Sequence, residues 1–249
     1  MRRALWFAVA VAAFLAVPAQ AFADQLLPDL GMARFTTISI DTTTMPGHSL
    51  LRYTATLVNV GAGPLQFTGT RTDTSTPTMS VTQRIFNSDG TYSDVATPLT
   101  MIYAGDGHNH WHTQDIETGQ LARLDNGTVV GRLAKHGFCF SDTLGYNLTL
   151  PGAPQAKVYT PAGCSPNNPA ALTTTMGLSV GWGDRYGAAT NLQWIDITGL
   201  PDGKYQLTAT ADPTSGAVES NYTNNTVYAN LLITGGASSL KVLKKGPGA

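Results

Sequence analysis

The sequence predicts an all-β fold, with one β-sandwich-like domain and long irregular loops. Three observations predict it. Short runs rich in valine, isoleucine, threonine and aromatic residues alternate with turns rich in glycine and proline. After the first 23 residues, no segment of useful length repeats its apolar side chains at helical spacing. Charged residues are only 12% of the 249 residues, a length that suits one large β domain with a buried core.

The first half of the chain is expected to form a series of short strands. A strong hairpin signal is Asp125-Asn126-Gly127, because Asn-Gly readily adopts the positive φ angles of a tight turn. Turn sequences rich in glycine, proline and asparagine separate the other runs. The expected strands cover residues 35–41, 49–59, 65–70, 80–86, 91–95, 120–124 and 128–133.

The second half begins with a composition rich in proline, glycine and asparagine over residues 151–169, which predicts a long irregular loop. Buried strands are expected at 176–182 and 193–197. Residues 204–211 alternate polar and apolar side chains, and 226–234 do so loosely, so these two segments are expected to pair. Residues 236–249 are predicted to be a disordered tail.

Residues 1–23 have the pattern of a secretory signal peptide. A basic start, Met1-Arg2-Arg3, precedes an apolar run, and Ala21-Phe22-Ala23 supplies small residues at the expected cleavage site. The apolar run is too short for a comfortable membrane span, and no later segment is long enough. We therefore expect a secreted, extracellular protein whose domain covers residues 24–235. The net charge of −1 gives no reason to expect nucleic acid or an anionic membrane surface as a partner.

The two cysteines of the chain, Cys139 and Cys164, are expected to form a disulfide, because an exported protein folds in an oxidising compartment. Closing a loop of about 25 residues stabilises the fold by roughly 3 kcal/mol, because the bond restricts the unfolded chain. Two free thiols, or Cys139 as a soft metal ligand, are the alternatives.

Three of the five histidines, His108, His110 and His112, occupy alternate positions. Alternate side chains of a strand share a face, which would leave Asn109 and Trp111 on the other face. A local twist or bulge could then bring three imidazoles around one ion. Neutral imidazole suits copper, zinc, nickel or iron, so the ligand type leaves the metal open. The alternative is the solvated face of an ordinary strand.

Four segments of the chain, in the same order, resemble the catalytic domain of the lysyl oxidase family. The resemblance extends over residues 27–235. The histidine segment is similar to the copper-binding segment of the family, and the other three are similar to its cross-linked lysine, its cofactor tyrosine and its closing hairpin. The segments are His108-Asn109-His110-Trp111-His112 with Asp115, Lys135-His136-Gly137-Phe138-Cys139, Tyr186-Gly187-Ala188 continuing to Gln193-Trp194-Ile195-Asp196-Ile197-Thr198, and Glu219-Ser220-Asn221-Tyr222-Thr223-Asn224-Asn225.

This resemblance implies a copper amine oxidase with lysine tyrosylquinone, a cofactor built from the protein's own side chains. His108, His110 and His112 would bind copper, and Lys135 would add its amine to the oxidised ring of Tyr186. Such an enzyme converts a primary amine, either peptidyl-lysine or a small amine, to an aldehyde with dioxygen, and releases hydrogen peroxide and ammonia. Lys135 and Tyr186 would therefore have to meet beside the metal.

The sequence leaves the general base, the substrate and the oligomeric state open. Asp115 and His136 are candidates for the base, although Asp115 would face away from the histidines in a regular strand. Animal members of the family carry a cysteine beside the histidine triplet, which this chain lacks, and this departure puts the substrate in doubt. The alternatives are an exported copper-binding β-sandwich without catalysis and a cell-surface adhesion module with incidental histidines.

Overall fold

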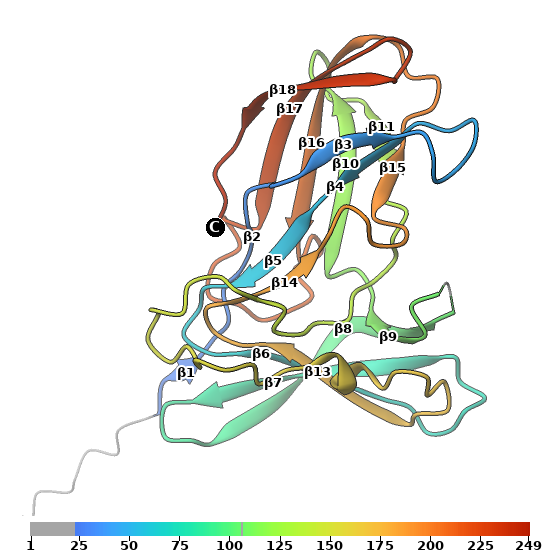
Figure 1. Cartoon of the computed structure of the whole chain (residues 1–249). Helices are drawn as coiled ribbons and strands as arrows, with labels where there is room; N and C mark the ends of the chain where they lie inside the picture. The colour runs from blue at the N-terminus through green and yellow to red at the C-terminus, as the bar shows by residue number, and fades with distance from the viewer. Residues whose placement is uncertain (1–22, 106) are drawn as a thin grey trace, which may run out of the picture.

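The structure is a computed structural model that describes residues 23–105 and 107–249 (Figure 1). The expected signal peptide, apart from its last residue, lies outside the described residues. Within them the chain is built of strands and one short 3-10 helix, η1 (Pro161–Cys164), so the predicted all-β class is confirmed. None of the described residues belongs to a helix long and apolar enough to cross a membrane.

A six-stranded antiparallel sheet lies at the bottom of the view in Figure 1 and carries the histidines at its edge. Inward-facing side chains of its central strands are buried at every second position, as a sheet with one face on the core requires. Its strand order is β13-β6-β7-β8-β9, with β1 also paired to β7. The strands are β1 (Gln25–Leu26), β6 (Leu65–Thr70), β7 (Thr78–Asn87), β8 (Tyr92–Ala104), β9 (His110–Thr113) and β13 (Thr173–Leu178).

A five-stranded antiparallel sheet stands at the top of the view, in the order β11-β10-β16-β17-β18. The expected hairpin joins β10 and β11, with Gly127 at a φ of 72°, and the expected pairing of β16 with β17 is confirmed. The strands are β10 (Glu117–Arg123), β11 (Val129–Arg132), β16 (Gly203–Ala211), β17 (Thr226–Thr234) and β18 (Ser239–Lys245).

The predicted disordered tail is wrong, because β18 pairs along β17. Leu240 and Val242 alternate with lysines and pack against the core, and Lys245 Nζ donates a hydrogen bond to the Phe35 carbonyl at 2.6 Å. A charged outer face with two apolar inner positions is a common form of edge strand. The composition of residues 236–249 therefore does not reveal β18, a short strand with apolar side chains on the face toward the core.

Two smaller sheets complete the fold, and one of them, β15-β4-β3, lies against the five-stranded sheet (Figure 1). The orders are β12-β14-β5-β2 and β15-β4-β3. The run 49–59, predicted as one strand, divides at Thr54, whose N–H donates to the Thr37 carbonyl and whose hydroxyl accepts from the Ala188 N–H. The strands are β2 (Leu30–Met32), β3 (Ile38–Asp41), β4 (Leu50–Tyr53), β5 (Ala55–Asn59), β12 (Leu144–Gly145), β14 (Trp182–Tyr186) and β15 (Trp194–Asp196).

A disulfide joins Cys139 to Cys164 across 5.8 Å between their Cα atoms, as predicted. Free thiols and a metal-ligand role for Cys139 are thereby ruled out. The bond links the segment after β11 to the irregular loop that contains η1, and both cysteines belong to the hydrophobic core. It therefore fixes the chain just beyond Lys135.

Candidate functional site

The three histidines gather at the β9 edge of the six-stranded sheet. His110 and His112 lie in β9, whereas His108 lies in the preceding turn, where Gly107 and Asn109 have positive φ angles of 97° and 53°. This turn places the His108 ring centroid 5.8 Å from that of His110 and 5.3 Å from that of His112. Their shared direction thus depends on a turn, and not on strand alternation alone.

Two of these imidazoles have the spacing of ligands that share one ion. His112 Nε2 lies 2.8 Å from His110 Nε2, and two nitrogens bound at right angles to one metal are about 2.9 Å apart. His112 Nδ1 faces the His136 carbonyl at 3.3 Å, a partner typical of metal-ligating histidines. Across residues 23–105 and 107–249, however, no group of three or more His, Cys, Asp or Glu side chains is arranged to hold an ion as it stands. The chemistry of three neighbouring imidazoles suits a metal ion, and of the three pairs the structure gives the His110–His112 pair the separation of two ligands on one ion.

The protein environment keeps His112 neutral. Its side chain is completely buried, and this burial lowers its pKa to about 3, with further lowering by the charges of Lys135, His110 and His108. A neutral imidazole is the form that binds a metal ion. The influence of Lys135 also shows that the amine lies within electrostatic reach of the histidine cluster.

Backbone contacts join β9 to the segment that carries Lys135. Thr113 and Phe138 exchange two backbone hydrogen bonds, each of 2.9 Å. Gly137, the residue before Phe138, has a φ of 77°, and a Cβ atom there would lie 2.9 Å from the Cβ of His112. Only glycine fits both the backbone angle and this close approach. The sequence Lys135-His136-Gly137-Phe138 therefore lies directly against the histidine strand.

The structure brings together Lys135 and Tyr186, which are far apart in the sequence. Lys135 is 4% exposed, and its Nζ lies 5.0 Å from the centroid of the Tyr186 ring. Phe138 packs edge-to-face on the same ring, with centroids 5.0 Å apart. The Tyr186 hydroxyl donates to the Cys139 carbonyl at 2.9 Å and accepts from the Cys139 N–H at 3.1 Å. The disulfide segment thus holds the ring beside the amine.

Two buried carboxyl groups, Glu117 on β10 and Asp184 on β14, complete the cluster. Burial, helped by the nearby Asp184 and opposed by Lys135, raises the pKa of Glu117 to about 8. Burial likewise raises the pKa of Asp184 to about 8, against the lowering effects of Tyr186 and Lys135. The pKa of Tyr186 is held well above its usual value, first by burial and then by Asp184. All three groups are therefore mostly protonated at neutral pH.

Sequence reasoning missed both carboxyl groups, although a local signal existed. Glu117 occupies an inward position of β10, in register with Gly119 and Leu121, where an apolar side chain is the norm. Asp184 stands two residues before Tyr186 on β14, and so shares its direction. The candidate bases Asp115 and His136 are both exposed.

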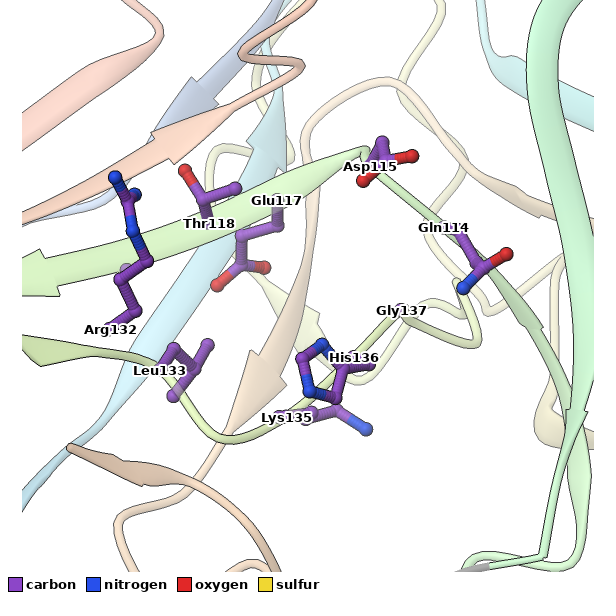
Figure 2. A pocket seen from close by; sticks show the side chains of 10 residues that line it. Gln114, Asp115, Glu117, Thr118, Arg132, Leu133, Lys135, His136 and Gly137 are labelled. Carbon is purple, nitrogen blue, oxygen red and sulfur yellow. The ribbon is translucent and has the colours of Figure 1, made fainter. Parts of the chain in front are cut away.

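A cavity of about 170 Å³ opens beside this cluster (Figure 2). Figure 2 shows the Glu117 side chain extending from β10 toward the segment that carries Leu133 and Lys135. Asp115 and His136 also line the cavity. Glu117 and Lys135, whose polar side-chain atoms are buried, thus both belong to the lining of one cavity.

Comparisons with known proteins place this part of the chain in one family. The sequence model of the lysyl oxidase family matches residues 78–242, a range that contains every residue of the cluster. Human protein-lysine 6-oxidase is 34% identical over 133 residues, which are 51% of this chain and 27% of the human protein. Pig protein-lysine 6-oxidase is 32% identical over 51% of this chain and 45% of its own. Human lysyl oxidase homolog 3 is 32% identical over 49% of this chain and 14% of its own. The alignments thus span less than half of each relative.

Proposed function

Because the chain belongs to the lysyl oxidase family, we propose that it is an amine oxidase. It converts a primary amine, dioxygen and water to an aldehyde, ammonia and hydrogen peroxide. The observation that supports this most is the position of the buried Lys135 amine, 5.0 Å from the Tyr186 ring centroid and within electrostatic reach of His112. An arrangement of a lysine, a tyrosine and three imidazoles is what a self-derived quinone requires.

In this proposal His108, His110 and His112 hold copper, and Lys135 and Tyr186 form lysine tyrosylquinone. When formed, the quinone accepts two electrons from the amine and passes them to dioxygen. The surrounding residues give the ring its position. Cys139 fixes the Tyr186 hydroxyl through two hydrogen bonds, and Phe138 covers the ring on one side.

The substrate proposed is a primary alkylamine, either free or at the end of a protein lysine side chain. A cavity of about 170 Å³ suits a narrow, extended chain that ends in an amine. The relatives named protein-lysine 6-oxidase support the lysine form, and n-butylamine is its small analogue. The signal-like residues 1–23 and the disulfide support a secreted protein, with dioxygen as the second substrate.

The test is amine-dependent release of hydrogen peroxide from copper-loaded protein, with n-butylamine and with a lysine-containing peptide. Peroxide and aldehyde in equal amounts are expected for at least one substrate. The matched control is Lys135→Arg, which keeps the positive charge but has no primary amine to join the ring. Stoichiometric copper without any turnover would contradict the proposal and indicate a copper-binding β-sandwich without catalysis. Absence of bound copper would leave a module with incidental histidines.

A further inference from the structure

Glu117 is a buried carboxyl group with no hydrogen-bond partner for either oxygen within the described ranges. Its side chain is 4% exposed. Leaving a buried polar group without a partner destabilises the folded state, and more strongly when the group is charged. An apolar side chain at this inward position of β10 would avoid that cost. The position therefore suggests a use for the carboxyl group other than stability.

The place of Glu117 in the fold puts it at the cavity beside the cluster. Glu117 and Lys135 both line this cavity, and Figure 2 shows the Glu117 side chain extending toward the segment that carries Lys135. Glu117 is the first residue of β10, and there the strand pairs with Ala211 of β16. A side chain on a paired strand is positioned more firmly than one on a loop.

We propose that Glu117 is the general base of this site and takes the proton from the α-carbon of the bound amine. This inference rests on the proposed function. The C–H bond breaks, and its proton forms an O–H bond on the Glu117 carboxylate. The quinone, once formed, would supply the two-electron acceptor for the electron pair of the C–H bond. The carbon would thereby reach the oxidation level of an aldehyde, and water would release it as the aldehyde. The proton then leaves Glu117 for solvent through the cavity.

Asp184 has a different place in the cluster. It does not line the cavity, and its Oδ1 lies 3.4 Å from the Thr143 hydroxyl. It lies beside Tyr186 and is the group that, after burial, most raises the pKa of that phenol. Asp184 is therefore a positioning residue for the ring, whereas Glu117 is the carboxyl group that faces the bound amine.

The charged and titratable neighbours of Glu117 set the pH at which it can act. Burial raises its pKa to about 8, so the carboxylate becomes available as the pH rises toward that value. A base with a pKa near the working pH is the most effective in proton transfer. The groups that face Glu117 or share its cavity are Asp184 and Tyr186 on β14, Tyr53 on β4, Lys135, and at the cavity Asp115, Arg132 and His136.

The decisive variant is Glu117→Gln in the copper-loaded protein, tested with two probes. Phenylhydrazine reports the quinone carbonyl without cleavage of a C–H bond, and n-butylamine requires that cleavage. We expect a normal phenylhydrazine adduct and a kcat for n-butylamine lowered about 100-fold or more. The isotope effect with α,α-dideuterated n-butylamine should increase. Glu117→Asp should restore part of the rate, and Asp125→Asn, an exposed carboxyl group in the β10–β11 turn, should leave it unchanged.

A second measurement needs neither copper nor turnover. In copper-free protein labelled with 13C-glutamate, the Glu117 carboxyl signal is identified by its loss in Glu117→Asp, which keeps a carboxyl group at this position. It should titrate near pH 8 and shift when n-butylamine is added. A signal that titrates near the ordinary glutamate value, or that ignores n-butylamine, overturns the inference even if Glu117→Gln does not fold.

The outcomes separate the two proposals. A Glu117→Gln variant that forms the adduct and oxidises n-butylamine at the wild-type rate overturns the role of Glu117 and leaves the amine oxidase standing. A wild-type protein that forms no adduct and oxidises no amine overturns the proposed function itself.

Discussion

The Nζ atom of Lys135 lies 5.0 Å from the centroid of the Tyr186 ring, and both side chains are held there by the segment around Cys139. The Phe138 ring contacts both groups, at 5.2 Å from Nζ and 5.0 Å from the Tyr186 centroid. One aromatic side chain and one disulfide thus bring an amine and a phenol from distant parts of the chain into a single site.

Removing the phenol should separate metal binding from catalysis. Tyr186→Phe keeps the ring but loses the hydroxyl, so no quinone can form and amine oxidation should fall to background. The Cys139 N–H and carbonyl lose their partner, which should lower the free energy of unfolding by about 1–3 kcal/mol. Copper content, phenylhydrazine absorbance and urea denaturation measure the three effects. A phenylhydrazine adduct in this variant would contradict the role of Tyr186.

Replacing one imidazole should abolish stoichiometric copper. His110→Ala removes a nitrogen 2.8 Å from His112 Nε2, and the remaining pair cannot provide three protein ligands. We expect copper in purified protein to drop well below one per chain, as measured by atomic absorption after dialysis. His48→Ala is the matched control, because His48 is half-exposed and pairs with Asp196 at 2.7 Å. If His110→Ala binds copper as tightly as wild type, the histidine cluster is not the metal site.

The buried carboxyl groups should make stability fall as the pH rises. Their folded pKa values of about 8 exceed the ordinary values of 4.5 for a glutamate and 3.8 for an aspartate side chain. Between these values the folded state binds more protons than the unfolded state, so stability is fully present at low pH and is lost on the way to pH 8. Glu117→Gln should remove its share of this loss, on the order of a few kcal/mol. Urea denaturation from pH 4 to 9 measures it, and parallel curves for the two proteins would contradict the buried, protonated state.

Breaking the disulfide should affect both stability and the site. Cys139→Ser with Cys164→Ser should lower the free energy of unfolding by about 3 kcal/mol. The backbone of residue 139 also anchors the Tyr186 hydroxyl, so the rate of quinone formation should decrease. Denaturation and the time course of phenylhydrazine-reactive absorbance after copper addition measure the two effects. A double variant as stable as wild type would show that the bond contributes little to the fold.

The sequence predicts well whatever depends on local chemistry. The Asn126-Gly127 turn, the pairing of β16 with β17 and the Cys139–Cys164 bond each follow from neighbouring residues or from the compartment, and the structure confirms them. The division of residues 49–59 at Thr54 was not predictable, because it depends on hydrogen bonds with Thr37 and Ala188, which come from elsewhere in the chain.

The candidate site was only partly predictable for a similar reason. Motif order identifies the histidines, Lys135 and Tyr186, but the turn at Gly107 and Asn109 appears only in three dimensions. The partners of Glu117 come from β14 and from the segment after β11, so its burial among them could not be read from its own strand. The alternation of β10 marks Glu117 as unusual without revealing which groups surround it.

Peptide mapping by mass spectrometry of copper-loaded protein tests the central claim most directly. We expect one cross-linked species that contains the Lys135 and Tyr186 peptides, with the mass of a lysine joined to an oxidised tyrosine ring, and we expect it to be absent in Lys135→Arg. Separate, unmodified Lys135 and Tyr186 peptides from fully copper-loaded wild-type protein would contradict it.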